Sequence, residues 1–277
     1  MQHQEGTFTG SAELQLYYQC WLPFEPPRAV LAIVHGIGEH GGRYNHVVDR
    51  MVPCDIAVCA MDLRGHGQSP GKRGALERWD QYVEDVGAFL ATVRENYPNQ
   101  PLFLMGHSMG GLISALYLEE NQDGLAGAVL SAPLLAQANV PGLLKRAVRI
   151  VARVAPGVGF SATVDPSIIS RDPAEVQRFV ADPLIHRQAT ARLGSELLRV
   201  LPLAHKRAGN VTLPLLIYHG DDDQLVPVSG SQRFSSAVAS RDRVFRIYPG
   251  GYHELHNDLN RNQVLDMLHA WLERHID

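Results

Sequence analysis

The chain has 277 residues, of which 45 % are hydrophobic and 19 % are charged, and its formal net charge at pH 7 is −4. This size is sufficient for one globular domain with an insertion, and the weakly acidic balance argues against a nucleic-acid-binding surface. The N-terminal residues lack the basic and apolar regions of a signal peptide, and no run approaches the ~18 apolar residues of a membrane span.

Three cysteines, Cys20, Cys54 and Cys59, lie in or beside apolar segments. Three are too few for a disulfide framework, so we expect reduced cysteines in the core. Reduced cysteines are typical of the cytoplasm, which is therefore the expected location.

Taken in chain order, the elements alternate between strands and helices. Residues 7–9 and 14–21 flank the Gly10-Ser11 turn and predict an N-terminal hairpin. Short apolar runs predict buried strands at 29–34, 56–61, 101–105, 125–130, 213–218 and 244–248. The clearest amphipathic helix has one apolar face made of Trp79, Tyr82, Val83, Val86, Phe89, Leu90 and Val93. The pattern predicts an α/β fold, with a mostly parallel eight-stranded sheet and flanking helices.

The alternation is interrupted over residues 134–208, where prolines divide the chain into short segments without a strand pattern. We expect an all-helical cap inserted before the strand at 213–218, over a core domain of residues 1–133 and 209–277. Within the cap, residues 143–154 carry an apolar stripe (Leu143, Leu144, Ala147, Val148, Val151, Val154) opposite a basic one (Lys145, Arg146, Arg149, Arg153). We expect the apolar stripe to pack on the core, with docking on an anionic membrane interface as the alternative.

The most informative motif is Gly106-His107-Ser108-Met109-Gly110, a G-x-S-x-G sequence between a predicted strand and a predicted helix at 112–118. In such a turn the serine has strained backbone angles, and small flanking residues let strand and helix approach closely. The turn presents the hydroxyl near the helix N-terminus, where backbone N–H groups point outward. The motif predicts that Ser108 is a nucleophile.

A serine nucleophile needs an imidazole to take its proton and a carboxylate to orient the imidazole. The strand at 213–218 is followed by Asp221, Asp222 and Asp223, and the strand at 244–248 is followed by His253. A candidate acid and then a candidate histidine therefore follow the serine along the chain, each just past the end of a later strand, as a strand–serine–helix turn of this kind requires. Spacing alone leaves the choice among the three aspartates open.

The loop at 36–41 reads Gly36-Ile37-Gly38-Glu39-His40-Gly41 and matches the dinucleotide pattern G-x-G-x-x-G, with Asp62 about twenty residues on. Two observations argue against a dinucleotide site. The loop continues where a helix should begin, and a dinucleotide site would leave the G-x-S-x-G serine Ser108 without a function. We favour an oxyanion-binding loop, in which the backbone N–H groups of Ile37 and Met109 face the developing oxyanion. No cofactor is expected.

Several motifs resemble the monoacylglycerol lipase and lysophospholipase group of the α/β-hydrolase superfamily, and the resemblance covers essentially the whole chain. They are His35 to His40 with Arg43-Tyr44, Asp62 to Ser69, Gly106 to Gly111, Ser170 to Pro173, Ala181 to Leu184, and Gly251 to His256. The resemblance implies acyl-ester hydrolysis by Ser108, Asp223 and His253, with Ile37 and Met109 as oxyanion hole. Its G-x-x-D pattern selects Asp223 and leaves Asp221 and Asp222 as turn residues that bond local N–H groups.

The same resemblance implies that Glu39, Arg43 and His256 lie near the alcohol part of the ester. His35 and His66 are expected to be structural hydrogen-bonding residues, and the spacing of His253 and His256 does not match a metal motif. The expected substrate is a monoacylglycerol, in an apolar tunnel lined by residues 143–154 and 197–203. A lysophospholipase, another carboxylesterase or thioesterase, and a non-catalytic binding protein are the alternatives.

Overall fold

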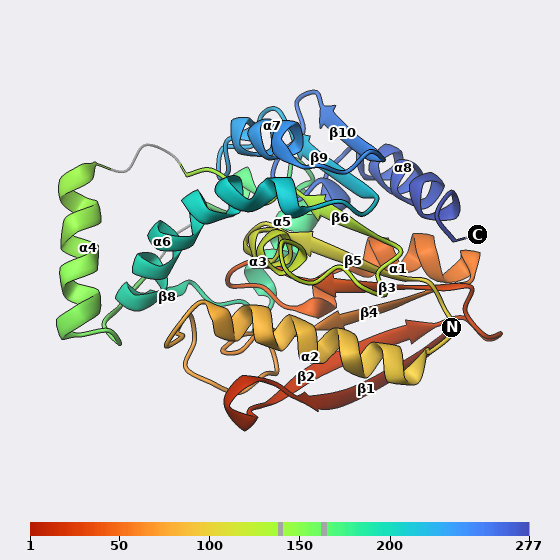
Figure 1. Cartoon of the computed structure of the whole chain (residues 1–277), viewed down its shortest axis with the longest axis horizontal. Helices are drawn as coiled ribbons and strands as arrows, with labels where there is room; N and C mark the ends of the chain where they lie inside the picture. Colours follow the sequence, from red (N-terminus) through yellow and green to blue (C-terminus); the bar gives the residue numbers. More distant parts are fainter. Residues whose placement is uncertain (138–140, 162–164, 277) are drawn as a thin grey trace.

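The computed structural model describes residues 1–137, 141–161 and 165–276. Its main sheet has eight strands in the order β1-β2-β4-β3-β5-β6-β9-β10 (Figure 1). The strands are β1 (Gln2–Thr9), β2 (Gln15–Leu22), β3 (Ala29–Val34), β4 (Ile56–Met61), β5 (Leu102–His107), β6 (Gly127–Ser131), β9 (Leu215–Gly220) and β10 (Arg243–Tyr248). The β1–β2 and β2–β4 pairs are antiparallel and the other pairs are parallel. The predicted fold class, the hairpin and the six strands are confirmed, with small shifts of their ends. The predicted burial was wrong for β10, because it is an edge strand whose residues are exposed or half-buried.

Alternating side chains of the central strands face two hydrophobic cores. On β3, Val30, Ala32 and Val34 face one core, while Leu31 and Ile33 face the other. The first core is closed by α2 (Asp80–Asn96), α3 (Met109–Leu118), α6 (Ala191–Arg207) and α7 (Val228–Ala237), and the second by α1 (Asn45–Met51) and α8 (Arg261–Glu273). Because parallel strands end at one edge, the loops after β3, β5, β9 and β10 meet there.

Short 3-10 helices join the larger elements. They are η1 (Ser11–Glu13), η2 (Gly41–Arg43), η3 (Val52–Cys54), η4 (Pro166–Ile168), η5 (Ala208–Asn210) and η6 (Leu255–Asn257). Two of them matter for the site, because η2 follows the loop after β3 and η6 follows the loop after β10.

The prediction of reduced cysteines was wrong for two of the three. Cys20 on β2 and Cys59 on β4 form a disulfide, and Cys54 is free. The strands pair antiparallel with these residues directly opposite each other, a register that the linear sequence does not display. The disulfide removes the cysteine argument for a cytoplasmic location. Among the helices that the structure describes, none combines the length and apolar character needed to cross a membrane.

The segment between β6 and β9 was predicted to be all-helical, and this was wrong because the segment also contains a small sheet. It holds α4 (Gly142–Val154), α5 (Pro173–Ala181) and α6, and two strands, β7 (Gly159–Ser161) and β8 (Gln188–Thr190), that pair antiparallel. Three-residue strands are too short to produce a recognisable alternation, and their partners are far apart in the sequence. The division into a core and a cap of residues 134–208 stays a prediction.

Helix α4 does not pack its apolar stripe on the core, so that expectation was wrong. It lies at the periphery of the molecule, beside α6 and away from the main sheet (Figure 1). Leu143 is 81 % exposed and Val154 is 78 % exposed, and Ile150, which lies outside the predicted stripe, is 61 % exposed. The helix thus presents apolar and basic side chains to solvent together.

Glu119, at the C-terminal end of α3, is a buried carboxyl group with an unusual environment. Neither of its carboxylate oxygens has a hydrogen-bond partner among the described residues. Burial raises the pKa of Glu119 to about 8. The folded protein therefore holds a proton on Glu119 that the unfolded chain, with a pKa of about 4.3, releases at lower pH.

We predict that the free energy of unfolding falls as pH rises from about 4.5 to 8, because over this range the folded state binds more protons than the unfolded state. Glu119→Gln should remove this part of the pH dependence, so that the variant gains stability relative to the wild type between pH 5 and pH 9. Urea unfolding at both pH values measures the difference. Glu95→Gln, at an exposed position on α2 where the described residues offer no ion-pair partner, is the control and should leave the pH dependence unchanged.

Candidate active site

Ser108 lies in the sharp turn between β5 and α3, where the sequence predicts it. Its backbone angles are φ 52° and ψ −118°, a conformation that L-residues rarely adopt. The flanking glycines allow the turn to form. A Cβ added to Gly110 would lie 2.1 Å from the Val34 carbonyl oxygen, and one added to Gly106 would lie 2.5 Å from the Gly110 carbonyl oxygen. The turn thus holds the Ser108 hydroxyl above the edge of the sheet.

The structure brings Ser108, His253 and Asp223 together. His253 Nε2 lies 2.9 Å from Ser108 Oγ, and His253 Nδ1 lies 2.6 Å from Asp223 Oδ2. Asp223 Oδ1 accepts hydrogen bonds from the N–H groups of Leu225 (2.8 Å) and Val226 (2.9 Å). Hydroxyl, imidazole and carboxylate therefore form one hydrogen-bonded line, which is the arrangement that proton transfer from the hydroxyl requires.

The ionisation of Asp223 and His253 is set by their burial and by their hydrogen-bond partners. Burial opposes ionisation of Asp223, but the imidazoles bonded to it outweigh burial and hold its pKa well below the usual range. Burial likewise disfavours an imidazolium at His253, but the Asp223 carboxylate outweighs it and raises the pKa of His253. Asp223 thus stays ionised across the ordinary pH range, and His253 is more basic than a free imidazole.

The two neighbouring aspartates have other surroundings. Asp221 Oδ1 accepts a hydrogen bond from the N–H of Gly250 at 2.6 Å, which ties the turn after β9 to the turn after β10. This contact differs from the predicted local bond. Asp222 is exposed and makes no side-chain hydrogen bond within the described ranges. Of the three aspartates, only Asp223 contacts the imidazole of His253.

The loop after β3 lies directly beside Ser108. A Cβ on Gly36 would lie 3.0 Å from Ser108 Cβ, and both Gly36 and Ile37 line the cavity at Ser108. Met109 is the first residue of α3. Neither the Ile37 N–H nor the Met109 N–H donates a hydrogen bond to a group in the part of the chain that the structure describes. The helix after this loop, α1, starts only at Asn45, so the glycines do not open a helix as in a dinucleotide site.

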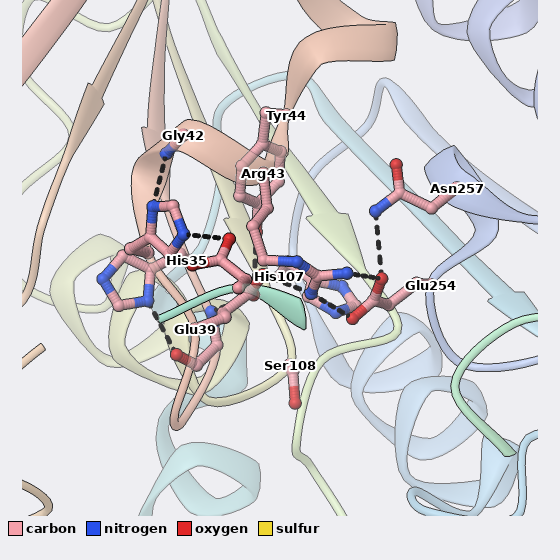
Figure 2. Close-up of polar contacts among 12 residues, drawn as sticks. His35, Glu39, Gly42, Arg43, Tyr44, His107, Ser108, Glu254 and Asn257 are labelled. Atoms are coloured by element: carbon pink, nitrogen blue, oxygen red, sulfur yellow. Dashed lines mark hydrogen bonds and ion pairs between the residues drawn. The ribbon is translucent and has the colours of Figure 1, made fainter. Parts of the chain in front are cut away.

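Figure 2 shows a buried ion-pair network near Ser108 that includes Glu39 and Arg43. The guanidinium of Arg43 donates to both carboxylate oxygens of Glu254, at 2.6 and 2.8 Å, and to Glu39 at 3.2 Å. Glu39 also accepts from the Gly36 N–H at 2.6 Å and from the Tyr44 hydroxyl at 3.1 Å. The network therefore orders the loop that lies beside Ser108.

The two carboxyl groups of the network differ in their pKa. Burial raises the pKa of Glu39, and the attraction of Arg43 does not fully offset it. At Glu254, burial acts in the same direction, but the two bonds from Arg43 outweigh it and lower the pKa to about 2. The charge of Arg43 is thus matched by Glu254. Sequence reasoning missed Glu254, although its position directly after His253 was the available signal.

His256 lies in the interior beside Tyr44, and its predicted role on the alcohol side of the ester stays a prediction. Its ring is fully buried, stacks on Tyr44 with 4.8 Å between ring centroids, and meets the edge of His107. It is absent from the residues that line the cavity at Ser108. Tyr44 and His107 thus surround the His256 ring, and this burial lowers its pKa to about 4.

His35 and His66 make the structural hydrogen bonds expected of them. His35 Nε2 accepts from the Leu63 N–H at 2.9 Å, and its Nδ1 donates to the Gly36 carbonyl oxygen at 2.7 Å. His66 Nδ1 donates to the Arg64 carbonyl oxygen at 3.0 Å. Both rings therefore brace the loops around the site.

A cavity of about 200 Å³ opens onto Ser108. Its polar lining residues are Glu39, His107, Ser108, His253 and Glu254, and its apolar lining residues are Ile37, Leu134, Ile169, Phe179, Leu225 and Val226. The predicted tunnel lining, residues 143–154 and 197–203, was wrong, because α4 lies away from this cavity and α6 contributes no side chain to it. The segment between β6 and β9 contributes Leu134, Ile169 and Phe179 instead.

Comparison with known proteins supports one family. The family model described as serine aminopeptidase, S33, matches residues 25–260. The chain is 35 % identical over 274 residues to the monoacylglycerol lipase of Mycolicibacterium smegmatis, covering 98 % of each chain. It is 33 % identical over 264 residues to the monoglyceride lipase of Homo sapiens, covering 94 % of this chain and 87 % of the human protein. The solved monoacylglycerol lipase of Paleococcus ferrophilus superposes with a TM-score of 0.84 at 32 % identity, over 94 % of this chain and 99 % of that chain.

The fold and the Ser108–His253 pair define the class of the protein as a serine hydrolase with the α/β-hydrolase fold. Within that class, the chain belongs to the serine aminopeptidase S33 family and, in it, to the monoacylglycerol lipase group. The family resemblance predicted from the sequence motifs is confirmed.

We predict that Asp223→Asn lowers kcat by about 10⁴, because the amide favours the wrong tautomer of the imidazole and does not stabilise an imidazolium. Asp221→Asn and Asp222→Asn, which remove one carboxylate each from the same turn, should cost less than about tenfold. The measurement is kcat with a chromogenic ester for the three variants. A larger loss in either control than in Asp223→Asn would show that the acid has been assigned to the wrong aspartate.

Proposed function

We propose that the protein hydrolyses monoacylglycerols to fatty acid and glycerol through an acyl-enzyme on Ser108. The observation that carries the proposal is the 2.9 Å contact between Ser108 Oγ and His253 Nε2, in a cavity lined by both apolar and polar residues. An acyl chain needs apolar lining residues and a glycerol leaving group needs polar ones.

In the proposed reaction, His253 Nε2 takes the proton of Ser108 while Oγ attacks the ester carbonyl carbon. The N–H groups of Ile37 and Met109 donate to the oxyanion of the tetrahedral intermediate, each contributing on the order of 3 kcal/mol of transition-state stabilisation. The imidazolium, held by Asp223, then protonates the leaving glycerol oxygen as the C–O bond breaks. Water gives a proton to His253 Nε2 as it attacks the acyl carbonyl carbon. The imidazolium then returns this proton to Ser108 Oγ as the C–Oγ bond breaks and the fatty acid leaves.

The ion-pair network favours a neutral alcohol over an anionic one, which separates a monoacylglycerol from a lysophospholipid. Arg43 is the cation of the network, and it is already paired with Glu254 and Glu39. A phosphodiester would find no unpaired positive charge there and would face two carboxyl groups at short range. The hydroxyls of glycerol can instead donate to the carboxylate of Glu39, which lines the cavity. Glu39 and Arg43 thus form the proposed alcohol subsite, and His256 supports it from behind through Tyr44.

We predict that kcat/KM for monoacylglycerols rises with acyl length to at least about eight carbons, because each buried CH₂ contributes ~0.8 kcal/mol. Ser108→Ala should reduce hydrolysis to below about 1 % of the wild-type rate and abolish labelling by a fluorophosphonate probe. A series of monoacylglycerols of graded length, assayed with both proteins, measures the two effects.

Lysophospholipids, thioesters and short acyl esters, assayed at matched concentrations, test the competing activities. A decisive preference for acetate and butyrate esters would replace the lipase with a short-chain carboxylesterase. A wild-type protein that neither turns over esters nor reacts with the probe would instead be the non-catalytic binding protein.

The exposed helix α4 supports a transient contact with a membrane surface. Its exposed leucines, Leu143 and Leu144, are joined on the same helix by the basic Lys145, Arg149 and Arg153. A helix of this composition lies in the headgroup region of an anionic bilayer, with the apolar side chains inserted. Such a contact would bring the protein to the lipid phase in which its proposed substrate resides.

We predict that Lys145→Glu, Arg149→Glu and Arg153→Glu together weaken binding to phosphatidylserine vesicles at least tenfold, since each basic residue near such a surface contributes about 1 kcal/mol. Hydrolysis of vesicle-borne substrate should fall with binding, while hydrolysis of soluble esters should be unchanged. Reversal of three exposed arginines far from α4, Arg241, Arg246 and Arg274, gives the same net charge and is the matched control. Equal losses in both triple variants would argue against docking through α4.

A further inference from the structure

A second histidine contacts the carboxylate of Asp223. His219, near the end of β9, lies with its Nε2 3.0 Å from Asp223 Oδ2, the same oxygen that His253 Nδ1 approaches at 2.6 Å. The side chain of His219 is fully buried and lines no part of the cavity at Ser108. The carboxylate oxygen thus lies between two imidazoles, of which one faces the serine and the other faces the protein interior.

The ring of His219 is held in one orientation by its other contacts. Its Nε2 also lies 3.0 Å from the Val226 carbonyl oxygen, and its Nδ1 lies 2.8 Å from Ser231 Oγ on α7. Both partners of Nε2 are acceptors, so this nitrogen carries a hydrogen and donates it. Ser231 is itself fully buried. Contacts from the turn after β9 and from α7 therefore hold the His219 ring so that its Nε2–H group points toward Asp223 Oδ2.

We propose that His219 is a positioning residue for the proposed triad of Ser108, Asp223 and His253, and that its Nε2–H fixes Asp223 Oδ2 and sets how much of the carboxylate charge acts on His253. The inference rests on the proposed function of the triad. No substrate atom is reached by His219, which acts only through Asp223.

The hydrogen-bond inventory of Asp223 explains why this donor matters. A carboxylate offers about four lone-pair sites, and Asp223 uses two at Oδ1, for the N–H groups of Leu225 and Val226, and two at Oδ2, for the two imidazoles. Loss of the His219 donor leaves one buried site without a partner. The negative charge of Asp223, which the His219 N–H group had partly offset, then acts more strongly on His253. This favours the protonated form of His253 and reduces the fraction that is a neutral base.

The other groups that face His253 are independent of position 219. The carboxylates of Glu39 and Glu254 raise the pKa of His253 in smaller measure than Asp223 does, and they belong to other loops. The centroid of the His107 ring lies 4.8 Å from that of the His253 ring, and the hydroxyl of Ser108 is hydrogen-bonded to Nε2 of His253. None of them contacts His219, so a change in the titration of His253 after substitution of His219 reports on Asp223.

The test compares His219→Leu, which removes the donor, with His219→Gln, whose amide N–H can replace Nε2–H. In the full-length protein, the acid limb of the kcat/KM profile of His219→Leu should move to higher pH by about 0.5 to 1 unit. Its plateau kcat should fall about tenfold, as the carboxylate loses one of its fixed contacts. His219→Gln should restore the limb to the wild-type position and recover most of kcat.

Ser231→Ala removes a contact that holds the His219 ring without touching the donor, and Ser235→Ala, a buried serine one turn further along α7, is its matched control. Ser231→Ala should move the acid limb in the same direction by a smaller amount, and Ser235→Ala should not move it. A limb that stays in place or moves to lower pH in both His219→Leu and Ser231→Ala overturns the proposal, as does a glutamine variant that behaves like leucine. These outcomes differ from failure of the proposed function, in which the wild-type protein itself shows no Ser108-dependent ester cleavage.

Discussion

The close approach of β3, β5 and α3 at the glycines around Ser108 is the constraint on which the rest of the site depends. Where Gly110 passes the Val34 carbonyl oxygen, there is no room for a side chain, and Ser108 is held at a positive φ. This backbone conformation costs on the order of 1 to 3 kcal/mol, which the packing of the two cores must offset. In return, the serine hydroxyl has one position, and the loops after β3, β9 and β10 can be arranged around it.

Around that fixed point, buried charges are balanced in two separate groups. Asp223 receives four hydrogen bonds, two from the backbone and two from imidazoles, so its charge is held without a permanent cation beside it. Arg43 is matched by Glu254, with Glu39 close by. Removing one member of either group would leave an uncompensated buried charge, which is far more costly than the pair is stabilising. The first group contacts the serine through His253, and the second lies close enough for Glu254 and Glu39 to raise the pKa of His253, so the two groups are electrostatically coupled.

Local patterns predicted most of the fold and the positions of Ser108 and His253, because strand ends and tight turns are encoded in adjacent residues. The choice of Asp223 among three adjacent aspartates came from the family resemblance. What the sequence did not reveal depends on which elements become neighbours. Cys20 and Cys59 are opposite each other only because β2 pairs with β4, and the contact of His219 with Ser231 requires α7 to pack on β9. The apolar stripe of α4 was assigned to the core because periodicity identifies an apolar face and gives no information on what covers it. The burial of the His256 ring was likewise not predictable, since a position in a motif does not tell whether the ring faces the cavity or the interior.

The segment between β6 and β9 divides into parts that are attached to the core to different degrees. The chain at α5 is hydrogen-bonded to the loop after β3 and to α1, with His40 Nε2 2.8 Å from Asp182 Oδ2 and His46 Nε2 2.7 Å from Glu175 Oε1. The guanidinium of Arg43 also lies over the ring of Phe179, 4.7 Å from its centroid. Phe179 lines the cavity, so this part of the segment is coupled to the ion-pair network and to the wall of the site. Helix α4 packs along α6, and in the described residues its side chains form no ion pair with the core. Contact with a lipid surface through α4 would therefore leave the cavity wall at Ile169 and Phe179 in place, because the two functions reside on parts of the segment with different anchors.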